Sequence, residues 1–312
     1  MAKVIGILSG KGGVGKTTLV SNLAASLTKN FNKNVLVFDT NINTSHLGLH
    51  LGMYEDLPVT LREVLRRKTS IMHAVYTHPN TGIRLVPAPL SGDGINLTKE
   101  KCCRLVNQLK NSYDMVILDC PPGLGKETIV AISAIDEAII ITTPDIPAVT
   151  DALKTVEILN RIGKKTLGIV VNRSRNEKYE LQPQEISSTC KCDVIATIPE
   201  DRKILRSISK GMPAVLLYPH SPASNSVKKL AAKLLGKSYK EPSFFDKLKR
   251  LLGRNEEGDT KIVIKEQEQA VSKEAEIRDV KKLKEGLTKE VKEELKREIV
   301  EMVKKKLKEK VV

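Results

Sequence analysis

Residues 10–18 read Gly10-Lys11-Gly12-Gly13-Val14-Gly15-Lys16-Thr17-Thr18. This stretch fits the pattern G-x-x-x-x-G-K-[ST], which is typical of loops that wrap around phosphate groups. The apolar run at residues 4–8 predicts a buried strand before the loop, and apolar residues recur at helical spacing from Leu19 to Leu27 after it. Strand, glycine-rich loop and helix, in this order, are the context that the pattern requires. The sequence therefore predicts a phosphate-binding loop.

The residue types of the loop indicate how it would bind. Glycines let the backbone turn its N–H groups toward an anion, and the start of the helix adds partial positive charge. We expect Lys16 to reach the β- and γ-phosphates of a nucleotide, and the Thr17 hydroxyl to ligate Mg²⁺. All nine residues from Gly10 to Thr18 are candidate nucleotide contacts.

Lys11 sets this loop apart, because phosphate binding alone does not need a lysine directly after the first glycine. The sequence K-G-G-x-G-K-T-T resembles the deviant Walker A loop of the MinD/ParA family of ATPases. In that family the extra lysine reaches across a dimer to the partner's nucleotide. The resemblance implies ATP and Mg²⁺ as cofactors, a homodimer in the ATP-bound form, and catalytic roles for Lys11 and Lys16. The alternative for Lys11 is a solvated surface lysine.

Residues 1–237 alternate between apolar runs of strand length and helical patterns, and the resemblance spans about residues 2–237. The alternation predicts an α/β fold, a mostly parallel twisted sheet with helices on both faces, and the loop makes it a P-loop NTPase. Ligands are then expected at the carboxyl ends of the strands. Further predicted strands lie at 35–38, 83–86, 115–118, 138–141, 167–171 and 194–198.

Two of these strands end in aspartate. Asp119 opens a D-x-P-P-G segment that resembles the family's second motif, where the aspartate holds Mg²⁺ and Gly123 moves with the γ-phosphate. The other strand ends in Asp39-Thr40-Asn41, whereas the family usually has D-x-D, with its second aspartate positioning the attacking water. Asn41 keeps an oxygen acceptor but lacks the charge. We therefore expect Mg²⁺ at Thr17, Asp39 and Asp119, catalytic roles for Asp39 and Asn41, and slow or partner-dependent hydrolysis.

A third strand end offers a candidate for reading the base. The carboxamide of Asn172, in Val-Val-Asn-Arg, matches the adenine edge and resembles the base-reading asparagine of the family; its alternative role is a strand-end turn residue. Pro199 and Glu200, in Ile-Pro-Glu-Asp, resemble the family's later nucleotide-pocket loop. These segments look more like MinD than like the DNA-partitioning branch.

Composition constrains the partners and the compartment. The 312 residues carry a formal net charge of +15, which favours nucleic acid, anionic lipid or a nucleotide as partner. We expect no signal peptide, and no apolar run reaches the roughly 18–20 residues that span a bilayer, so a cytoplasmic protein is expected. Five cysteines argue against a disulfide framework; Cys190 and Cys192 are packing or surface thiols, or half of a shared metal site. The five histidines show no convincing ligand spacing.

Residues 238–254 read as a linker followed by a short amphipathic helix. One face carries Lys247, Lys249 and Arg250, which suits the interface of an anionic membrane, as in MinD proteins, and implies a peripheral membrane protein. The alternative is that the apolar face packs on the protein itself. The apolar face consists of Phe244, Phe245, Leu248, Leu251 and Leu252.

Residues 255–312 form an extension that goes beyond the resemblance. They hold 16 Lys or Arg and 15 Asp or Glu, so the charge excess lies before them. Aliphatic residues from Ile277 to Leu307 recur at helical spacing, which predicts a long helix or coiled coil for self-association or a partner helix; a solvated, disordered tail is the alternative.

Together these features predict a MinD-like ATPase that cycles between the cytoplasm and the membrane as an ATP-dependent dimer and positions other proteins. The basic charge supports an alternative, a ParA-like ATPase that binds DNA and partitions it. Asn41 supports another, a nucleotide-gated scaffold without catalysis. An iron–sulfur carrier would need paired cysteines that the sequence does not offer.

Overall fold

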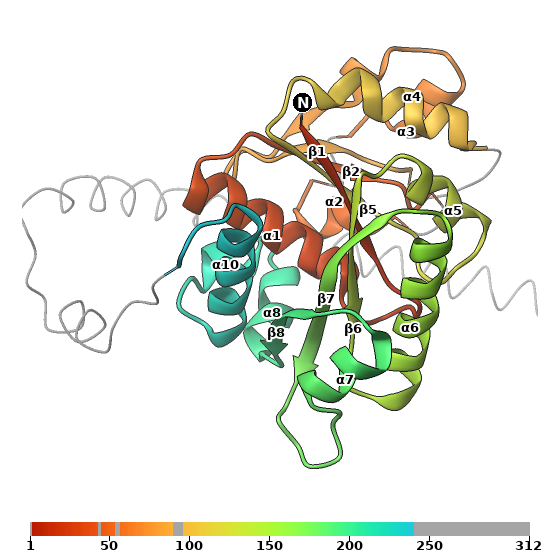
Figure 1. The fold of residues 1–312 in the computed structure, drawn as a ribbon. Coiled ribbons are helices and arrows are strands. Elements are labelled where there is room, and N and C mark those ends of the chain that lie inside the picture. The colour runs from red at the N-terminus through yellow and green to blue at the C-terminus, as the bar shows by residue number, and fades with distance from the viewer. Residues whose placement is uncertain (1, 43–44, 54–56, 90–95, 240–312) are drawn as a thin grey trace, which may run out of the picture. The chain divides into compact units, whose positions relative to one another are not determined.

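A computed structural model describes residues 2–42, 45–53, 57–89 and 96–239. They form one eight-stranded sheet in the order β3-β4-β2-β5-β1-β6-β7-β8, and only the β3–β4 pair is antiparallel (Figure 1). The strands are β1 (Lys3–Leu8), β2 (Val35–Asp39), β3 (Tyr76–Thr77), β4 (Arg84–Val86), β5 (Met115–Asp119), β6 (Glu137–Thr142), β7 (Lys165–Ser174) and β8 (Val194–Pro199). The helices are α1 (Lys16–Phe31), α2 (Leu47–His50), α3 (Leu61–Leu65), the 3-10 helix η1 (Ile71–Ala74), α4 (Lys99–Lys110), α5 (Lys126–Ser133), α6 (Ile146–Arg161), α7 (Pro183–Cys190), α8 (Arg202–Ile208), α9 (Ala214–Leu217) and α10 (Pro222–Leu234).

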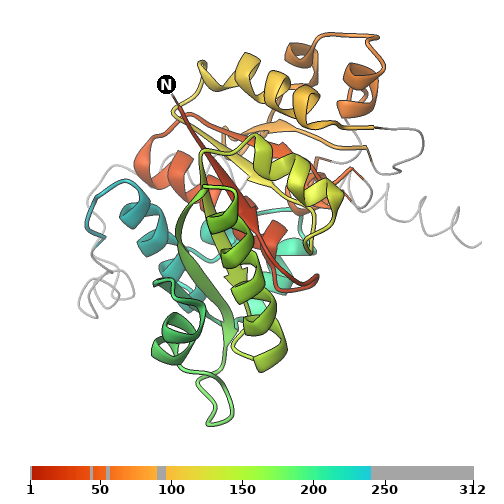
Figure 2. The same ribbon diagram turned by 45° about the vertical axis from the view of Figure 1, so that its right-hand side comes forward.

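Helices cover both faces of the sheet (Figures 1 and 2). Alternate residues of its central strands belong to two different cores, one on each face. Ile5 and Ile7 of β1 join the core under α1 and α10. Val4 and Leu8 join the core formed with α4, α5, α6 and α7. Strands that are apolar on both faces are what a parallel sheet between two helical layers requires, so the predicted fold class is confirmed.

The predicted strands all appear, with their ends shifted by a few residues. The sequence did not predict β3, since two residues carry no periodicity and this strand forms only through its pairing with β4. β1 lies between β5 and β6 in the sheet. The carboxyl ends of β1, β2, β5, β7 and β8 therefore lie along one edge, where the glycine-rich loop also begins.

The chain divides into two units, Met1–Glu241 and Pro242–Val312, and only the first contains described residues. The predicted amphipathic helix and the charged extension belong to the second unit and lie outside the described residues. In the part that the structure describes, no helix is both long enough and apolar enough to cross a membrane. All five cysteines are free, and Cys190 is buried against α6, where its thiol lies 3.8 Å from the Val149 carbonyl oxygen.

Candidate nucleotide-binding site

The loop between β1 and α1 has the backbone that its glycines predict. Gly13 and Gly15 adopt φ of 81° and 96°, a region that other residues rarely occupy. Gly15 caps α1 without a side-chain hydrogen bond, so the first N–H groups of the helix stay available to an anion. A Cβ at Gly15 would lie 2.3 Å from the Asn172 amide nitrogen, which donates to the Val14 carbonyl at 2.7 Å. The end of β7 thus packs directly against the loop.

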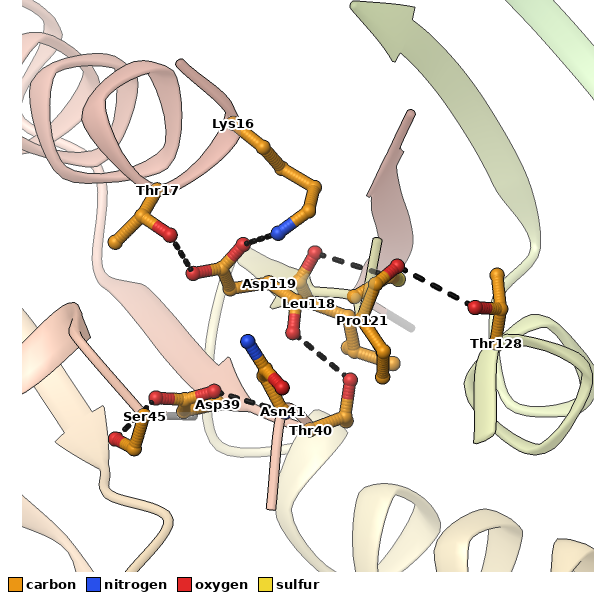
Figure 3. A network of polar contacts seen from close by, with 11 residues as sticks. Lys16, Thr17, Asp39, Thr40, Asn41, Ser45, Leu118, Asp119, Pro121 and Thr128 are labelled. Carbon is orange, nitrogen blue, oxygen red and sulfur yellow. Dashed lines mark hydrogen bonds and ion pairs between the residues drawn. The ribbon is translucent and has the colours of Figure 1, made fainter. Parts of the chain in front are cut away.

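Asp119, at the end of β5, accepts hydrogen bonds from two residues of the loop (Figure 3). The Lys16 ammonium lies 2.9 Å from Oδ1, and the Thr17 hydroxyl lies 2.7 Å from Oδ2. Only 7% of Lys16 and 1% of Asp119 are exposed. Burial acts to lower the pKa of Lys16, but the Asp119 carboxylate outweighs it and the pKa lies above its ordinary value. Lys16 therefore carries a full positive charge at neutral pH.

Asp39, at the end of β2, is completely buried beside this cluster. It accepts a hydrogen bond from the Asn41 backbone N–H at 2.9 Å and from the Ser45 hydroxyl at 2.7 Å (Figure 3). Pairing of β2 with β5 places Asp39 in register with Asp119. Burial and then repulsion from Asp119 raise the pKa of Asp39 to about 7. Two buried carboxyl groups therefore share Lys16 as their buried cation.

This donor set suits Mg²⁺. A hydroxyl and two carboxylates are the oxygen ligands that the ion prefers, and a divalent cation would relieve the repulsion between the two buried carboxyl groups. The residues in question are Thr17, Asp39 and Asp119. No group of three or more histidine, cysteine or acidic side chains gathers as a metal cage within the described residues. A site with few protein ligands matches the way Mg²⁺ binds with water and nucleotide phosphates in NTPases.

Two adjoining cavities meet at Gly15, Thr18, Arg173 and Ile208. The first, about 400 Å³, is lined by the loop together with residues that follow β2 and β5. The second, about 290 Å³, lies between the start of α1, the ends of β7 and β8, and α8. The first cavity is the more polar of the two, and such a cavity on a glycine-rich loop, joined to a more apolar one, is the shape that a nucleotide's phosphates and base require. We call the first the phosphate cavity and the second the base cavity.

The structure brings together most of the residues that the sequence singled out. Asn172, Pro199 and Glu200 line the second cavity, and Asn41 lines the first. Gly123 has φ of 78° and donates its N–H to the Ser9 carbonyl at 2.9 Å, which ties the D-x-P-P-G segment to the loop. Lys11 is exposed on the loop and does not line the phosphate cavity of its own chain.

Several lining residues were not predicted. His46 and His50 of the α2 segment line the phosphate cavity, and Arg173, with φ of 58°, borders both cavities. Burial lowers the pKa of His50, so its ring is neutral at neutral pH. The only local signal of the two histidines is a four-residue spacing soon after a strand-ending aspartate, which also occurs on helices that only pack. Ile204 and Ile208 of α8 follow Glu200 closely and form the apolar wall of the second cavity.

Comparison with known proteins places these features in a family. Residues 2–172 match the family model described as AAA domain. An uncharacterized ATP-binding protein of Methanocaldococcus jannaschii is 40% identical over 262 residues, which cover 81% of this chain and 98% of that protein. The septum site-determining protein MinD of Synechocystis sp. is 32% identical over 261 residues, covering 81% and 97% of the two chains.

Solved structures agree with the sequence relatives. MinD from Pyrococcus horikoshii, complexed with Mg-ADP, superposes with a TM-score of 0.71 at 31% identity and covers 75% of this chain and 96% of its own. A ParA-family ATPase from Chlorobium tepidum shares the fold, with a TM-score of 0.66 at 21% identity, 74% of this chain and 97% of that one. With its lysine-bearing loop and its MinD relatives, this chain belongs to the MinD/ParA family of P-loop ATPases.

Proposed function

We propose that this protein binds and hydrolyses ATP with Mg²⁺, dimerises in its ATP-bound form, and attaches reversibly to an anionic membrane surface to position partner proteins. The observation that carries the ATPase proposal is the hydrogen-bonded cluster of Lys16, Thr17 and Asp119 at the mouth of the glycine-rich loop. The adjoining base cavity and the Mg-ADP complex of the similar MinD protein support ATP as the ligand.

The positions of the residues support the following roles. The loop N–H groups and Lys16 bind phosphate oxygens, while Thr17, Asp119 and Asp39 would hold Mg²⁺, which neutralises charge on the phosphates. Asn172 and the residues after β8 orient the base. Lys11 is exposed and does not line the phosphate cavity of its own chain, which suits a contact with the nucleotide of a second copy. In that dimer each chain would complete its partner's site.

Asn41 supports slow hydrolysis. Its side chain can orient a water by hydrogen bonding, but a neutral amide cannot accept the proton that the attacking water loses. Asn41→Asp should therefore raise the rate of phosphate release, on the order of 100-fold or more. Slow hydrolysis is refuted if the wild-type protein already releases phosphate as fast as the Asn41→Asp variant. Complete absence of release, with ATP still bound, would favour the nucleotide-gated scaffold.

Membrane attachment is proposed from the sequence of residues 244–252, which lie outside the described residues. A single short amphipathic helix binds lipid weakly, whereas a dimer presents two, and the second inserts at high effective concentration. Co-sedimentation with anionic vesicles should therefore require ATP and fail with ADP or without nucleotide. Phe245→Asp combined with Leu248→Asp should abolish it, and attachment that survives this pair of substitutions would overturn the proposal.

The net charge of +15 supports a second candidate, a DNA-partitioning ATPase. Non-specific binding to duplex DNA depends steeply on salt, because neutralised phosphates release counterions. ATP-dependent retardation of DNA that weakens strongly between 50 and about 200 mM salt, together with no vesicle binding, would favour this candidate.

A further inference from the structure

The phosphate cavity is lined by imidazole rings where α2 borders it, and by a glycine-rich backbone where the loop borders it. His46 and His50, four residues apart, line this cavity together with Asn41. No acidic side chain lines the described part of the cavity, whereas Lys16 and Arg173 both do. The sequence motifs assign no role to either histidine. An anion in this cavity would therefore meet imidazoles on one side and loop N–H groups on another.

The α2 segment is fixed at both ends. Before the helix, the Ser45 hydroxyl donates to the buried Asp39 carboxylate at 2.7 Å. After it, Gly52 packs so closely on the turn after α8 that a Cβ would lie 2.8 Å from the Gly211 carbonyl oxygen. The backbone N–H of His50 donates to the His46 carbonyl at 3.0 Å. The position of His50 is thus set by the strand end and by the turn after α8, whose Ile208 borders the same cavity.

Burial closes off one of the two ring nitrogens of His50. Its Nδ1 is buried and has no hydrogen-bond partner among the described residues. An acceptor without a partner is tolerated in protein interiors more often than an N–H without one, so the hydrogen of the neutral ring belongs on Nε2. The ring lines the cavity with its Nδ1 side closed off. Its Nε2–H is therefore the donor that it can offer there.

We propose that His50 donates a hydrogen bond from Nε2 to the phosphate chain of the bound nucleotide, as a positioning residue that supplements the glycine-rich loop. This proposal rests on the proposed function, because it requires that the cavity holds nucleotide phosphates. A phosphate oxygen is a charged acceptor, and a hydrogen bond from a ring N–H to a charged acceptor is stronger than one between neutral groups. Asn41, which replaces an aspartate, helps to keep the wall beside His50 free of negative charge.

The test is titration of the full-length chain with Mg-ATP and Mg-ADP by calorimetry, comparing three substitutions at one position. His50→Ala removes the donor and should weaken binding about 10- to 100-fold. His50→Gln carries an N–H close to the position of Nε2 and should restore most of the affinity. His50→Asn places its amide close to Nδ1 instead and should bind as weakly as the alanine variant. His73→Gln, at an exposed histidine that bonds to Thr69, is the matched control and should change nothing.

The outcomes separate this proposal from the one on which it rests. A wild-type protein that binds neither nucleotide refutes the proposed function itself. If the wild type binds but His50→Asn, folded by circular dichroism, binds as tightly, the role of His50 is refuted even if the alanine variant fails to fold. A loss confined to Mg-ATP supports a contact with the γ-phosphate, and equal losses with Mg-ADP support a contact with the α- or β-phosphate.

Discussion

Replacing Asp39 by asparagine should stabilise the nucleotide-free protein, and the gain should grow with pH. Asp39 is completely buried in register with Asp119, and Lys16 is the buried cation that both share. An asparagine of the same shape can still accept the hydrogen bond from the Asn41 N–H through its oxygen. The Ser45 hydroxyl, which now donates to Oδ2, can rotate and accept from the new amide group. The substitution therefore removes a buried charge and preserves the local hydrogen bonds.

The size of the gain follows from the pKa of Asp39. It rises from its ordinary value of 3.8 to about 7 on folding. Between these values the folded protein holds a proton that the unfolded chain has released, so stability falls by up to about 1.4 kcal/mol per pH unit. The fall levels off about one pH unit above this pKa. We therefore expect Asp39→Asn to gain about 2–4 kcal/mol at pH 8 and clearly less at pH 5.

Urea unfolding of the full-length chain in EDTA, followed by circular dichroism at pH 5 and pH 8, measures this difference. Asp193→Asn, at an exposed carboxyl group, serves as the control and should shift the midpoint little at either pH. The reasoning is refuted if Asp39→Asn gains nothing at pH 8 or gains equally at both values. The same variant should bind Mg²⁺ more weakly. The charge of Asp39 would then lower the stability of the metal-free protein because it serves metal binding.

The remaining predictions concern glycines whose α-carbons lie close to other residues. Gly15→Ala would bring a Cβ within 2.3 Å of the Asn172 amide at φ of 96°, and should reduce ATP affinity at least about tenfold in a fluorescent-nucleotide titration; unchanged affinity would contradict the packing of β7 on the loop. Gly52→Ala, which meets Gly211, should destabilise the fold by about 2 kcal/mol in urea. Gly125→Ala, where no atom lies within 4 Å, is its control, and equal effects would contradict the reasoning.

Much of the fold could be predicted because its signals are local. Residues 10–18 specify a loop through glycines at φ values that few other residues adopt, and the flanking apolar patterns specify a strand and a helix. Continuous apolar runs, such as that of β5, predicted strands buried on both faces. Strand β3 escaped prediction, because its two residues are extended only through pairing with β4.

The candidate site was predictable where a motif ends a strand, as for Asp39, Asp119 and Asn172, since parallel strands bring their carboxyl ends to one edge. His46 and His50 were not, because a four-residue spacing also occurs on helices that only pack. The lining of the second cavity by α8 likewise depends on where the chain returns after β8.

By itself, the sequence determined the loop, the strands and the identity of the charged residues. The tertiary structure decided which of them meet: the placement of β1 between β5 and β6 brings Lys16 to Asp119, and the pairing of β2 with β5 brings Asp39 beside the same carboxylate. Contacts between residues about 80 to 100 positions apart follow from packing across the whole sheet, and no local pattern records them. The buried charge of this cluster, and with it the pKa of Asp39, exists only in the folded chain.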